Sequence, residues 1–404
     1  MLKCCLLELP FGELYMKWDL LIKGGRVIDS TQNINGITDV AIVGDKIAAV
    51  GPNLPVLEAK TVIGAATKIV TAGFIDLHTH NYTTGPKDTE NQAIKLSVPA
   101  DATSMAYGCT TVLDAGTATP KEFPQYWETD MASAKTRIFA LTRMPDPHGP
   151  NPSTVAEASA MIKRYSDVLI GMKYHHSQHL LTLPLARESA DFGGGILMAE
   201  AYGAPIPHLL DYMNPGDILT HTFHASFRYP LWNHKGEIWP AVWDAVERGV
   251  YLDVGHGARG FAFRAMEKCL EAGLKPSTIS TDIHARNLDG PTFDMPTTMS
   301  KFLALGLSLE EVIEMSTSTP ARAIRKEGVF GTLNPGTIAD VTISEVAKGK
   351  FTYLDVLHEK RVGKERILPQ VIIYAGKVYE GPKYQPKPTM THQVDAPPGF
   401  IDET

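Results

Sequence analysis

The chain has 404 residues, of which 44% are hydrophobic and 21% are charged, and its formal net charge is −7. This composition is ordinary for a globular protein, and the lack of any basic run argues against nucleic acid as a partner. No stretch reaches the roughly 18 consecutive apolar residues of a membrane-spanning helix, so we expect no membrane association. The four cysteines form no Cys-x-x-Cys pair and no disulfide framework, which favours a reducing, cytoplasmic location.

The first fifteen residues precede the first regular pattern in the sequence. Their apolar run, Cys4–Leu7, ends at Glu8 and is too short for the core of a signal peptide. We interpret residues 1–15 as an N-terminal extension, with translation starting either at Met1 or at Met16. The alternative is that these residues add a small strand or pack on the surface of the fold.

Short segments of alternating apolar and polar residues, separated by glycine-containing turns, occur near both ends of the chain. This pattern is typical of β-sandwiches. We therefore predict one small β-sandwich domain built jointly from residues 16–70 and residues 329–382. Residues 383–404 are rich in proline and polar residues, and we expect them to form a loose C-terminal tail. The expected strands are Trp18–Ile22, Arg26–Ile28, Thr38–Ile42, Lys46–Val50, Ala339–Ile343, Val371–Tyr374 and Lys377–Tyr379.

Residues 71–328 alternate between apolar segments and stretches with a helical pattern. Eight strands with helices between them are the count of a (β/α)8, or TIM-like, barrel, so the predicted fold class is α/β. The helix after the last strand has Ser308 at its start and Glu311 three residues on, which predicts a capping box. The predicted barrel strands are Phe74–His80, Thr110–Asp114, Arg137–Leu141, Val168–Lys173, Gly195–Glu200, Asp217–His221, Gly249–Val254 and Ser277–Asp282.

The first of these strands ends in His78-Thr79-His80. Because side chains alternate between the two faces of a strand, both imidazoles point to the same side. A polar pair at the end of an apolar strand is costly unless it has a role. We favour a metal site, because two imidazoles at this spacing suit one ion. The alternative is a pair of hydrogen-bonded core histidines.

Other polar residues stand at or just after the ends of the later strands. They are Lys173, Glu200, His221 and Asp282, and the seventh strand is followed by His256. Each alone has an ordinary interpretation, because a lysine can extend to solvent and a carboxylate can cap a helix. The carboxyl ends of barrel strands meet at one mouth, where active sites collect, so we expect these side chains to lie together.

Lys173 is the unexpected member of this set. A charged lysine beside histidine ligands would be repelled by a metal ion, and burial near other cations favours the free amine. A free amine can add carbon dioxide and become an anionic carbamate, whose two oxygens can bridge two metal ions. The alternative is an ordinary lysine paired with Glu200 or Asp282.

Six longer stretches point to a family: Thr71–His80, Pro215–His221, Asp253–Gly257, Ser280–His284, Pro296–Lys301 and Gly336–Val341. Together they resemble the amidohydrolase superfamily, and within it the bacterial amidohydrolase/deacetylase group related to dihydroorotases and hydantoinases. The resemblance runs from about Lys17 to Gly381. It implies a metal-dependent enzyme that acts on carbon–nitrogen bonds other than peptide bonds.

The resemblance also implies a binuclear site, usually of two zinc ions. His78, His80 and Asp282 would hold the more buried ion, and His221 would help to hold the outer one. Lys173, converted by carbon dioxide to N6-carboxylysine, would bridge both ions together with a hydroxide. Glu200 departs from the pattern, because such families usually carry a histidine at this position in strand five.

A carboxylate is a harder ligand than an imidazole, so Glu200 shifts the preference of the outer site toward manganese. We interpret Glu200 as a ligand of the outer ion. In one alternative it pairs with a cationic group of the substrate or with His224, which leaves a single buried ion. In another alternative it faces away from the site.

The activity implied is hydrolysis of an amide, or of an ester, by a metal-bound hydroxide, as in N-acyl and acetyl deacylases. Asp282 would act as the proton shuttle, and His256 would orient the reacting carbonyl, unless it is a packing histidine. We expect a small-molecule substrate and a homo-oligomer. The residues predicted to bind substrate are Tyr174, His224, Arg228 and His284, of which Arg228 belongs to an aromatic segment that is either a lid or an interface patch.

Two other functions stay open at this point. One is a cyclic-amide hydrolase of the dihydroorotase or hydantoinase type. The other is a non-catalytic scaffold that kept the barrel and lost turnover. Glu200 favours the scaffold, but the presence of the full set of candidate ligands argues for an enzyme. That set is His78, His80, Lys173, His221 and Asp282.

Overall fold

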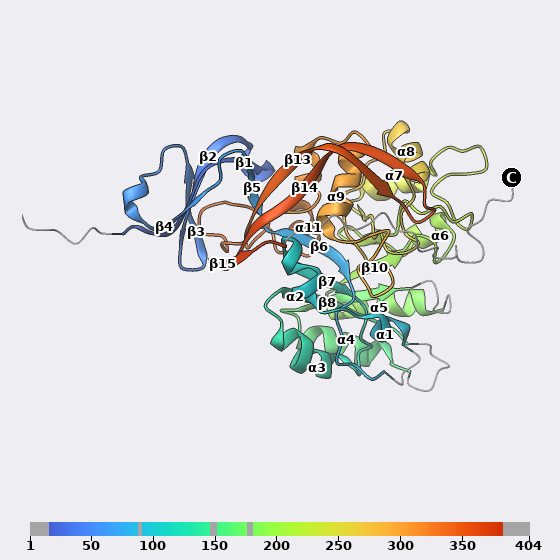
Figure 1. Cartoon of the computed structure of the whole chain (residues 1–404). Coiled ribbons are helices and arrows are strands. Elements are labelled where there is room, and N and C mark those ends of the chain that lie inside the picture. The colour runs from blue at the N-terminus through green and yellow to red at the C-terminus, as the bar shows by residue number, and fades with distance from the viewer. Residues whose placement is uncertain (1–15, 88–90, 146–151, 176–180, 383–404) are drawn as a thin grey trace, which may run out of the picture.

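The computed structural model describes residues 16–87, 91–145, 152–175 and 181–382, so the predicted N-terminal extension and C-terminal tail lie outside the described residues. The named strands form two sheets. Figure 1 shows the amino-terminal strands on one side of the helix-rich body, with a long hairpin reaching across that body. Within the described ranges, none of the helices is long and apolar enough to cross a membrane.

The larger body is built on a seven-stranded sheet in which every neighbouring pair is parallel. Its strands follow the chain in order, which confirms seven of the predicted barrel strands. All residues of β6 and β7 are buried, as expected for a parallel sheet covered on both faces. The strands are β6 (Phe74–Thr79), β7 (Cys109–Ala115), β8 (Arg137–Arg143), β9 (Leu169–Tyr174), β10 (Ile196–Glu200), β11 (Ile218–Thr220) and β12 (Tyr251–Leu252).

The predicted eighth strand, Ser277–Asp282, is wrong as a regular strand. The segment pairs with its neighbours through isolated parallel bridges, at Asp253↔Thr278 on one side and Thr79↔Ile283 on the other. On the β12 side further backbone hydrogen bonds support it, such as those from the N–H groups of Val254 and His256 to the carbonyls of Thr278 and Ser280. The physical reason is that side chains take over part of the ladder: the backbone N–H of Thr281 donates to the Asp76 carboxylate at 3.0 Å. The segment nevertheless lies between β12 and β6, where the eighth strand was expected.

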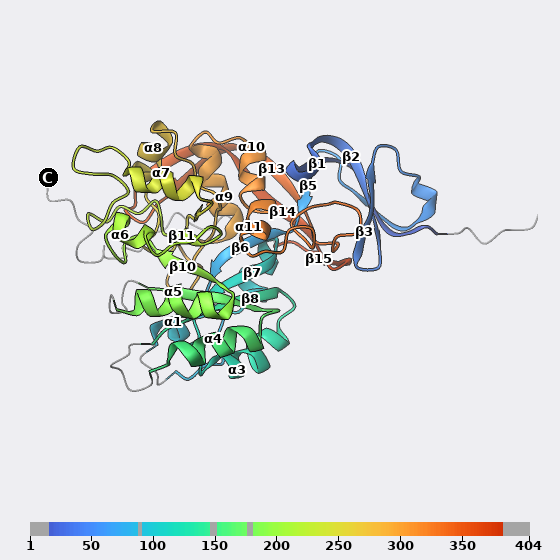
Figure 2. The ribbon, with the colours of Figure 1, turned by 180° about the vertical axis from the view of Figure 1, so that it is seen from behind.

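Helices surround the parallel sheet, and α4 and α5 lie side by side against β9 (Figure 2). Two of them begin with a capping box: α4 at Thr154 with Glu157, and α10 at Ser308 with Glu311, as predicted. The helices are α1 (Gln92–Leu96), α2 (Ala100–Thr103), α3 (Phe123–Tyr126), α4 (Val155–Arg164), α5 (Thr182–Gly193), α6 (Ile206–Leu210), α7 (Pro240–Glu247), α8 (Phe263–Glu271), α9 (Met295–Ala304), α10 (Leu309–Glu314) and α11 (Ser318–Ala323).

The second sheet is mixed and contains strands from both ends of the chain, as predicted. Its strand order is β15-β14-β13-β5-β1-β2-β3, and β4 pairs with β1. The two ends meet where β5 pairs antiparallel with β13. The strands are β1 (Trp18–Asp29), β2 (Ile34–Val43), β3 (Lys46–Gly51), β4 (Ala59–Gly64), β5 (Ile69–Ala72), β13 (Val341–Leu354), β14 (Lys360–Tyr374) and β15 (Lys377–Glu380).

The hairpin of β13 and β14 is much longer than the predicted strands Ala339–Ile343 and Val371–Tyr374. Its outer part carries many exposed polar residues, so it lacks the apolar alternation on which the prediction depended. This part packs along α9, where Ser300 Oγ accepts a hydrogen bond from the Ile367 N–H at 3.0 Å. The hairpin thereby ties the mixed sheet to the helices around the parallel sheet.

Arg137 joins the two sheets through an ion pair with Asp340, in which the carboxylate is buried and the arginine side chain is 17% exposed. Its guanidinium donates to Asp340 at 2.5 Å and to Thr111 at 2.8 Å, and it lies over the rings of Phe330 and Tyr374. Asp340 is buried, so removal of the guanidinium leaves a carboxylate without its charge partner. We predict that Arg137→Met lowers the free energy of unfolding by about 3 kcal/mol, measured by urea denaturation.

Arg26→Met is the matched control for that measurement. The Arg26–Glu310 pair also joins the mixed sheet to a helix, but its side chains are 41% and 39% exposed. Water already solvates these charges, so the loss should stay below about 1 kcal/mol. Equal losses in the two variants would contradict the role assigned to the buried pair.

Candidate metal centre

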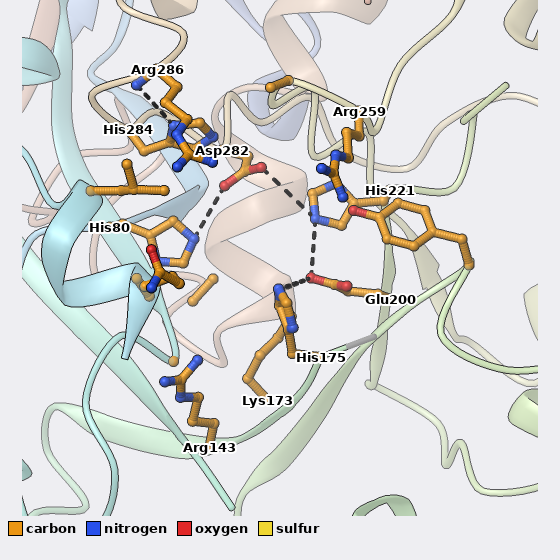
Figure 3. A pocket seen from close by; sticks show the side chains of 17 residues that line it. His80, Arg143, Lys173, His175, Glu200, His221, Arg259, Asp282, His284 and Arg286 are labelled. Carbon is orange, nitrogen blue, oxygen red and sulfur yellow. Dashed lines mark hydrogen bonds and ion pairs between the residues drawn. The ribbon is translucent and has the colours of Figure 1, made fainter. Parts of the chain in front are cut away.

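A cavity of about 360 Å³ opens at the carboxyl-terminal ends of the parallel strands. Lys173 and Glu200 come from the ends of β9 and β10, while His80 and His221 directly follow β6 and β11. Asp282 comes from the segment that closes the gap between β12 and β6. Figure 3 shows these side chains converging on one space. The structure therefore brings together residues that lie far apart in the sequence.

His78, His80 and Asp282 form the tightest group of metal-ligating side chains among the described residues. One ligand atom from each lies within 4.8 Å of the other two. The Nε2 atoms of His78 and His80 lie 3.5 and 3.2 Å from Asp282 Oδ1. Two imidazole nitrogens and a carboxylate oxygen at such separations can share one divalent ion.

Lys173, Glu200 and His221 adjoin this group. Lys173 Nζ lies 3.2 Å from His78 Nε2 and 3.5 Å from Glu200 Oε1. His221 Nε2 lies 3.4 Å from Glu200 Oε1 and 3.9 Å from Asp282 Oδ2. Glu200 thus points into the cavity, on the side of His221, and does not face away.

The other ring nitrogen of each histidine is held from behind the cavity. The Nδ1 atoms of His78 and His80 lie 2.9 and 2.8 Å from the hydroxyls of Thr220 and Thr117. His221 Nδ1 donates to the backbone carbonyl of Gly255 at 2.5 Å. Such contacts fix the orientation of each ring, so that Nε2 is directed toward the shared space.

The backbone at two of these residues is strained. His221 and Asp282 have φ angles of 54° and 48°, in the left-handed region that non-glycine residues rarely adopt. Neighbouring glycines make room for them: a Cβ at Gly257 would lie 2.1 Å from Asp282 Oδ2, and one at Gly260 would lie 2.2 Å from His221 Nδ1. Strain of this kind is concentrated at functional sites, so it supports a functional role for this mouth of the sheet.

The protonation of His78 and Asp282 suits a cation. Burial lowers the pKa of His78 well below its usual range, and the charge of Lys173 acts in the same direction. Burial acts to raise the pKa of Asp282, but His78 and the hydrogen bond from His80 outweigh it and hold that pKa well below its usual value. A neutral imidazole beside an ionised carboxylate is the form in which these side chains bind metal ions.

The other predicted site residues lie at different distances from the cavity. His284 lines it, with its ring centroid 6.4 Å from that of His80, and burial lowers the pKa of His284 to about 4. His224 is buried against the ring of Tyr202, which itself lines the cavity. Tyr174 lies on the opposite face of β9 from Lys173, and its hydroxyl donates to the Gly203 carbonyl at 3.1 Å.

His256 and Arg228 lie outside the lining of the cavity. His256 is buried, and its Nε2 lies 2.6 Å from Lys301 Nζ. Arg228 is exposed, and its backbone N–H donates to the Ser226 hydroxyl at 3.1 Å. The contact of His256 with Lys301 is of the kind expected of a packing histidine, the alternative interpretation of this residue.

Several residues that line the cavity were not predicted from the sequence, among them His175, Tyr202 and three arginines. His175 Nε2 lies 3.6 Å from Glu200 Oε1, and it follows Lys173 at the same two-residue spacing that singled out His78 and His80. Arg143 is the last residue of β8, a strand whose predicted end fell two residues short. Arg259 and Arg286 come from loops, where no periodic pattern marks a side chain as inward-facing.

Comparisons with known proteins agree with this geometry. The family model described as the amidohydrolase family matches residues 261–369. A deacetylase of Enterococcus faecalis is 32% identical over 385 residues, and the match covers 90% of this chain and 100% of the relative. The chain belongs to the amidohydrolase superfamily. It is accordingly a hydrolase that acts on carbon–nitrogen bonds.

Solved structures place this amidohydrolase among enzymes of similar fold. A crystal structure of an adenine deaminase is 30% identical, with a TM-score of 0.81, and covers 90% of this chain and 100% of that one. A dihydroorotase structure is 25% identical, with a TM-score of 0.77 and the same coverage. The family resemblance inferred from the sequence is thereby confirmed, and the parallel sheet is the sheet of a TIM-like fold.

Proposed function

We propose that this amidohydrolase is a metal-dependent deacylase that hydrolyses the amide, or the ester, of a small N-acyl or O-acyl compound. The observation that supports this most is the convergence of three imidazole Nε2 atoms and two carboxylates on one cavity. They belong to His78, His80, His221, Glu200 and Asp282. Similarity to the Enterococcus faecalis deacetylase over nearly the whole chain adds to it.

The residues present fit two ions in this proposal. His78, His80 and Asp282 would hold one ion, and His221 and Glu200 would hold the other. Lys173 would lie between them as N6-carboxylysine, a proposal supported by its burial and its 3.2 Å distance from His78 Nε2. Zinc suits the imidazole-rich site, and manganese suits the site with Glu200. When bound, such ions lower the pKa of a water molecule and polarise the scissile carbonyl.

Asp282 is the proposed proton shuttle. Its Oδ2 lies 3.9 Å from His221 Nε2, and its Oδ1 faces His78 and His80, so the carboxylate stands between the two groups of ligands. Its depressed pKa keeps the carboxylate in the ionised form, which is the form that a proton acceptor needs. From this position the carboxylate takes a proton from the attacking water and delivers it to the leaving nitrogen or oxygen.

The charge of the cavity points to the substrate class. Arg143, Arg259 and Arg286 line it from different sides (Figure 3). Guanidinium groups bind carboxylates through paired hydrogen bonds. We therefore propose an acyl compound that carries a carboxylate, such as an N-acyl amino acid or an O-acetyl hydroxy acid.

Hydrolysis of a cyclic amide is the second candidate. The dihydroorotase structure, at 25% identity and a TM-score of 0.77, favours it. A panel of N-acetyl amino acids, O-acetyl hydroxy acids, cyclic ureides and adenine separates the candidates. Cleavage of the first two classes alone supports the deacylase, and ring opening alone transfers the proposal to the cyclic-amide hydrolase.

We also propose that the parallel sheet closes into a (β/α)8 barrel over residues 71–328, with residues 16–70 and 329–382 as the second domain. The bridges at Thr278 and Ile283 support closure, because they connect one segment to both edge strands of the sheet.

The proposal predicts bound metal at about two ions per chain, measured by elemental analysis of the purified protein. Prolonged dialysis against a strong chelator should abolish hydrolysis of the best substrate in the panel, and zinc or manganese should restore it. Full activity in a preparation shown to be free of metal would contradict the proposal. A protein that retains no metal and turns over no substrate would support the non-catalytic scaffold.

Asp282→Asn should lower kcat by about 100-fold or more, because the amide cannot accept the proton. Metal content must be measured in the same preparation, since the substitution also removes a proposed ligand. Asp289→Asn is the matched control, because Asp289 lies on the same loop and is exposed outside the cavity. Near-normal turnover of the Asp282 variant would remove this residue from the mechanism.

Glu200→His should move the metal preference from manganese toward zinc, because imidazole is a softer and uncharged ligand. The measurement is the ratio of manganese to zinc retained when both ions compete for metal-free protein. Glu188→His, on the exposed side of α5, controls for an added surface histidine. An unchanged ratio in the Glu200 variant would show that Glu200 is not a ligand.

A further inference from the structure

Asp253 is a buried carboxylate outside the lining of the cavity, and the proposed mechanism does not use it. Three hydroxyl groups donate to it. Thr220 and Ser280 both donate to Oδ2 at 2.7 Å, and Thr278 donates to Oδ1 at 2.6 Å. These three residues come from β11 and from the segment that closes the sheet, so one carboxylate gathers hydroxyls from both sides of β12.

The Thr220 hydroxyl connects Asp253 to a proposed metal ligand. A hydroxyl has one proton, and that of Thr220 is donated to Asp253. The same oxygen lies 2.9 Å from His78 Nδ1, so it can only accept a hydrogen bond there. His78 Nδ1 must therefore carry the imidazole proton, which leaves the lone pair on Nε2, the atom that faces Lys173 and Asp282.

The Ser280 hydroxyl connects the same carboxylate to a second histidine. Ser280 Oγ donates to Asp253 and accepts from the Gly255 N–H at 2.9 Å. The Gly255 carbonyl accepts from His221 Nδ1. A Cβ at Gly255 would lie 2.3 Å from Thr220 Oγ1. The Gly255 backbone therefore packs directly against the hydroxyl that contacts His78.

We propose that Asp253 is a positioning residue that fixes His78 as the Nδ1–H tautomer through Thr220 and holds the Gly255 turn on which His221 depends. The inference deepens the proposed function, since it takes Nε2 of both histidines as metal-binding atoms. One buried carboxylate thus prepares one histidine of each proposed ion site. This role requires a hydrogen-bond acceptor at the position of Asp253 Oδ2, because only an acceptor there directs the Thr220 proton away from His78.

The alternative is a structural role alone, in which Asp253 merely satisfies three buried hydroxyls. The two roles differ in which hydroxyl matters. Thr220 and Thr278 each donate one hydrogen bond to the same carboxylate, and both are buried. Only Thr220 contacts a histidine. Thr220→Val and Thr278→Val are therefore a matched pair, because each replaces a hydroxyl by a methyl group of similar size.

The test uses the full chain in metal-free form, with ring-labelled histidine, and measures the tautomer of His78 by nitrogen-15 NMR. His78→Gln identifies its signals. We expect Nδ1–H in the wild type, in Thr278→Val and in Thr220→Ser, which restores the hydroxyl. We expect Thr220→Val to populate the Nε2–H tautomer, because Nδ1 loses its obligatory acceptor. We expect Asp253→Asn to shift the population in the same direction, because an amide N–H that faces Thr220 leaves the hydroxyl proton free to be donated to Nδ1. If Asp253→Asn fails to fold, Thr220→Val carries the test, and melting of each variant shows whether it folds.

A second readout is the affinity for zinc, measured by competition with a chelator. Thr220→Val should weaken binding by about 10- to 100-fold, as for other lost supports of a ligating histidine. Thr278→Val and Thr220→Ser should stay within about threefold of the wild type, well short of that loss. Equal behaviour of the two valine variants, or Nε2–H in the wild type, would overturn the inference. A wild type that binds no zinc yet shows the expected tautomers would overturn the proposed function and leave the positioning of His78 intact.

Discussion

Burial of charge at the end of an apolar sheet is the constraint on which this molecule depends. Lys173 and Glu200 are almost fully buried, yet they stand at the ends of strands whose other residues are largely apolar. An isolated charge in such a place costs several kcal/mol, so each must have a partner within reach. The partners come from other strands. The need of each buried charge for a partner therefore explains why the polar side chains at several strand ends lie around one cavity. A metal-dependent site is the chemical use that fits such a set of ligands.

The same constraint explains the irregular closing segment. The backbone and hydroxyl of Thr281 serve the buried carboxylate of Asp76, while Thr278 and Ser280 serve Asp253. The Thr281 N–H that donates to Asp76 is not available for a regular strand ladder with β6. In return, Asp282 emerges from this segment with the left-handed backbone that aims it between the histidines. The closing segment is therefore irregular at the place where it positions a candidate ligand.

Sequence reasoning succeeded where the pattern follows directly from strand geometry. The apolar run before His78 and His80 predicted both β6 and the shared direction of the two imidazoles, and the end of β10 predicted the inward position of Glu200. It failed at Ser277–Asp282, where the Asp76 carboxylate accepts a backbone N–H that a regular strand would donate to its neighbour. No pattern in the sequence marks Arg259 and Arg286, because loop residues reach the cavity through tertiary packing alone. The position of His256 just after a predicted strand made it a candidate site residue. Its contact with Lys301 depends on where α9 packs, and local sequence patterns do not predict the packing of a helix.

The most direct test of this account is a crystal structure of the protein saturated with zinc and manganese, with anomalous diffraction recorded at the absorption edges of both metals. The account predicts two peaks in the cavity, one bounded by His78, His80 and Asp282 and the other by His221 and Glu200, with additional density on Lys173 Nζ between them. A cavity without any anomalous peak, or a second ion held without Glu200, would contradict it.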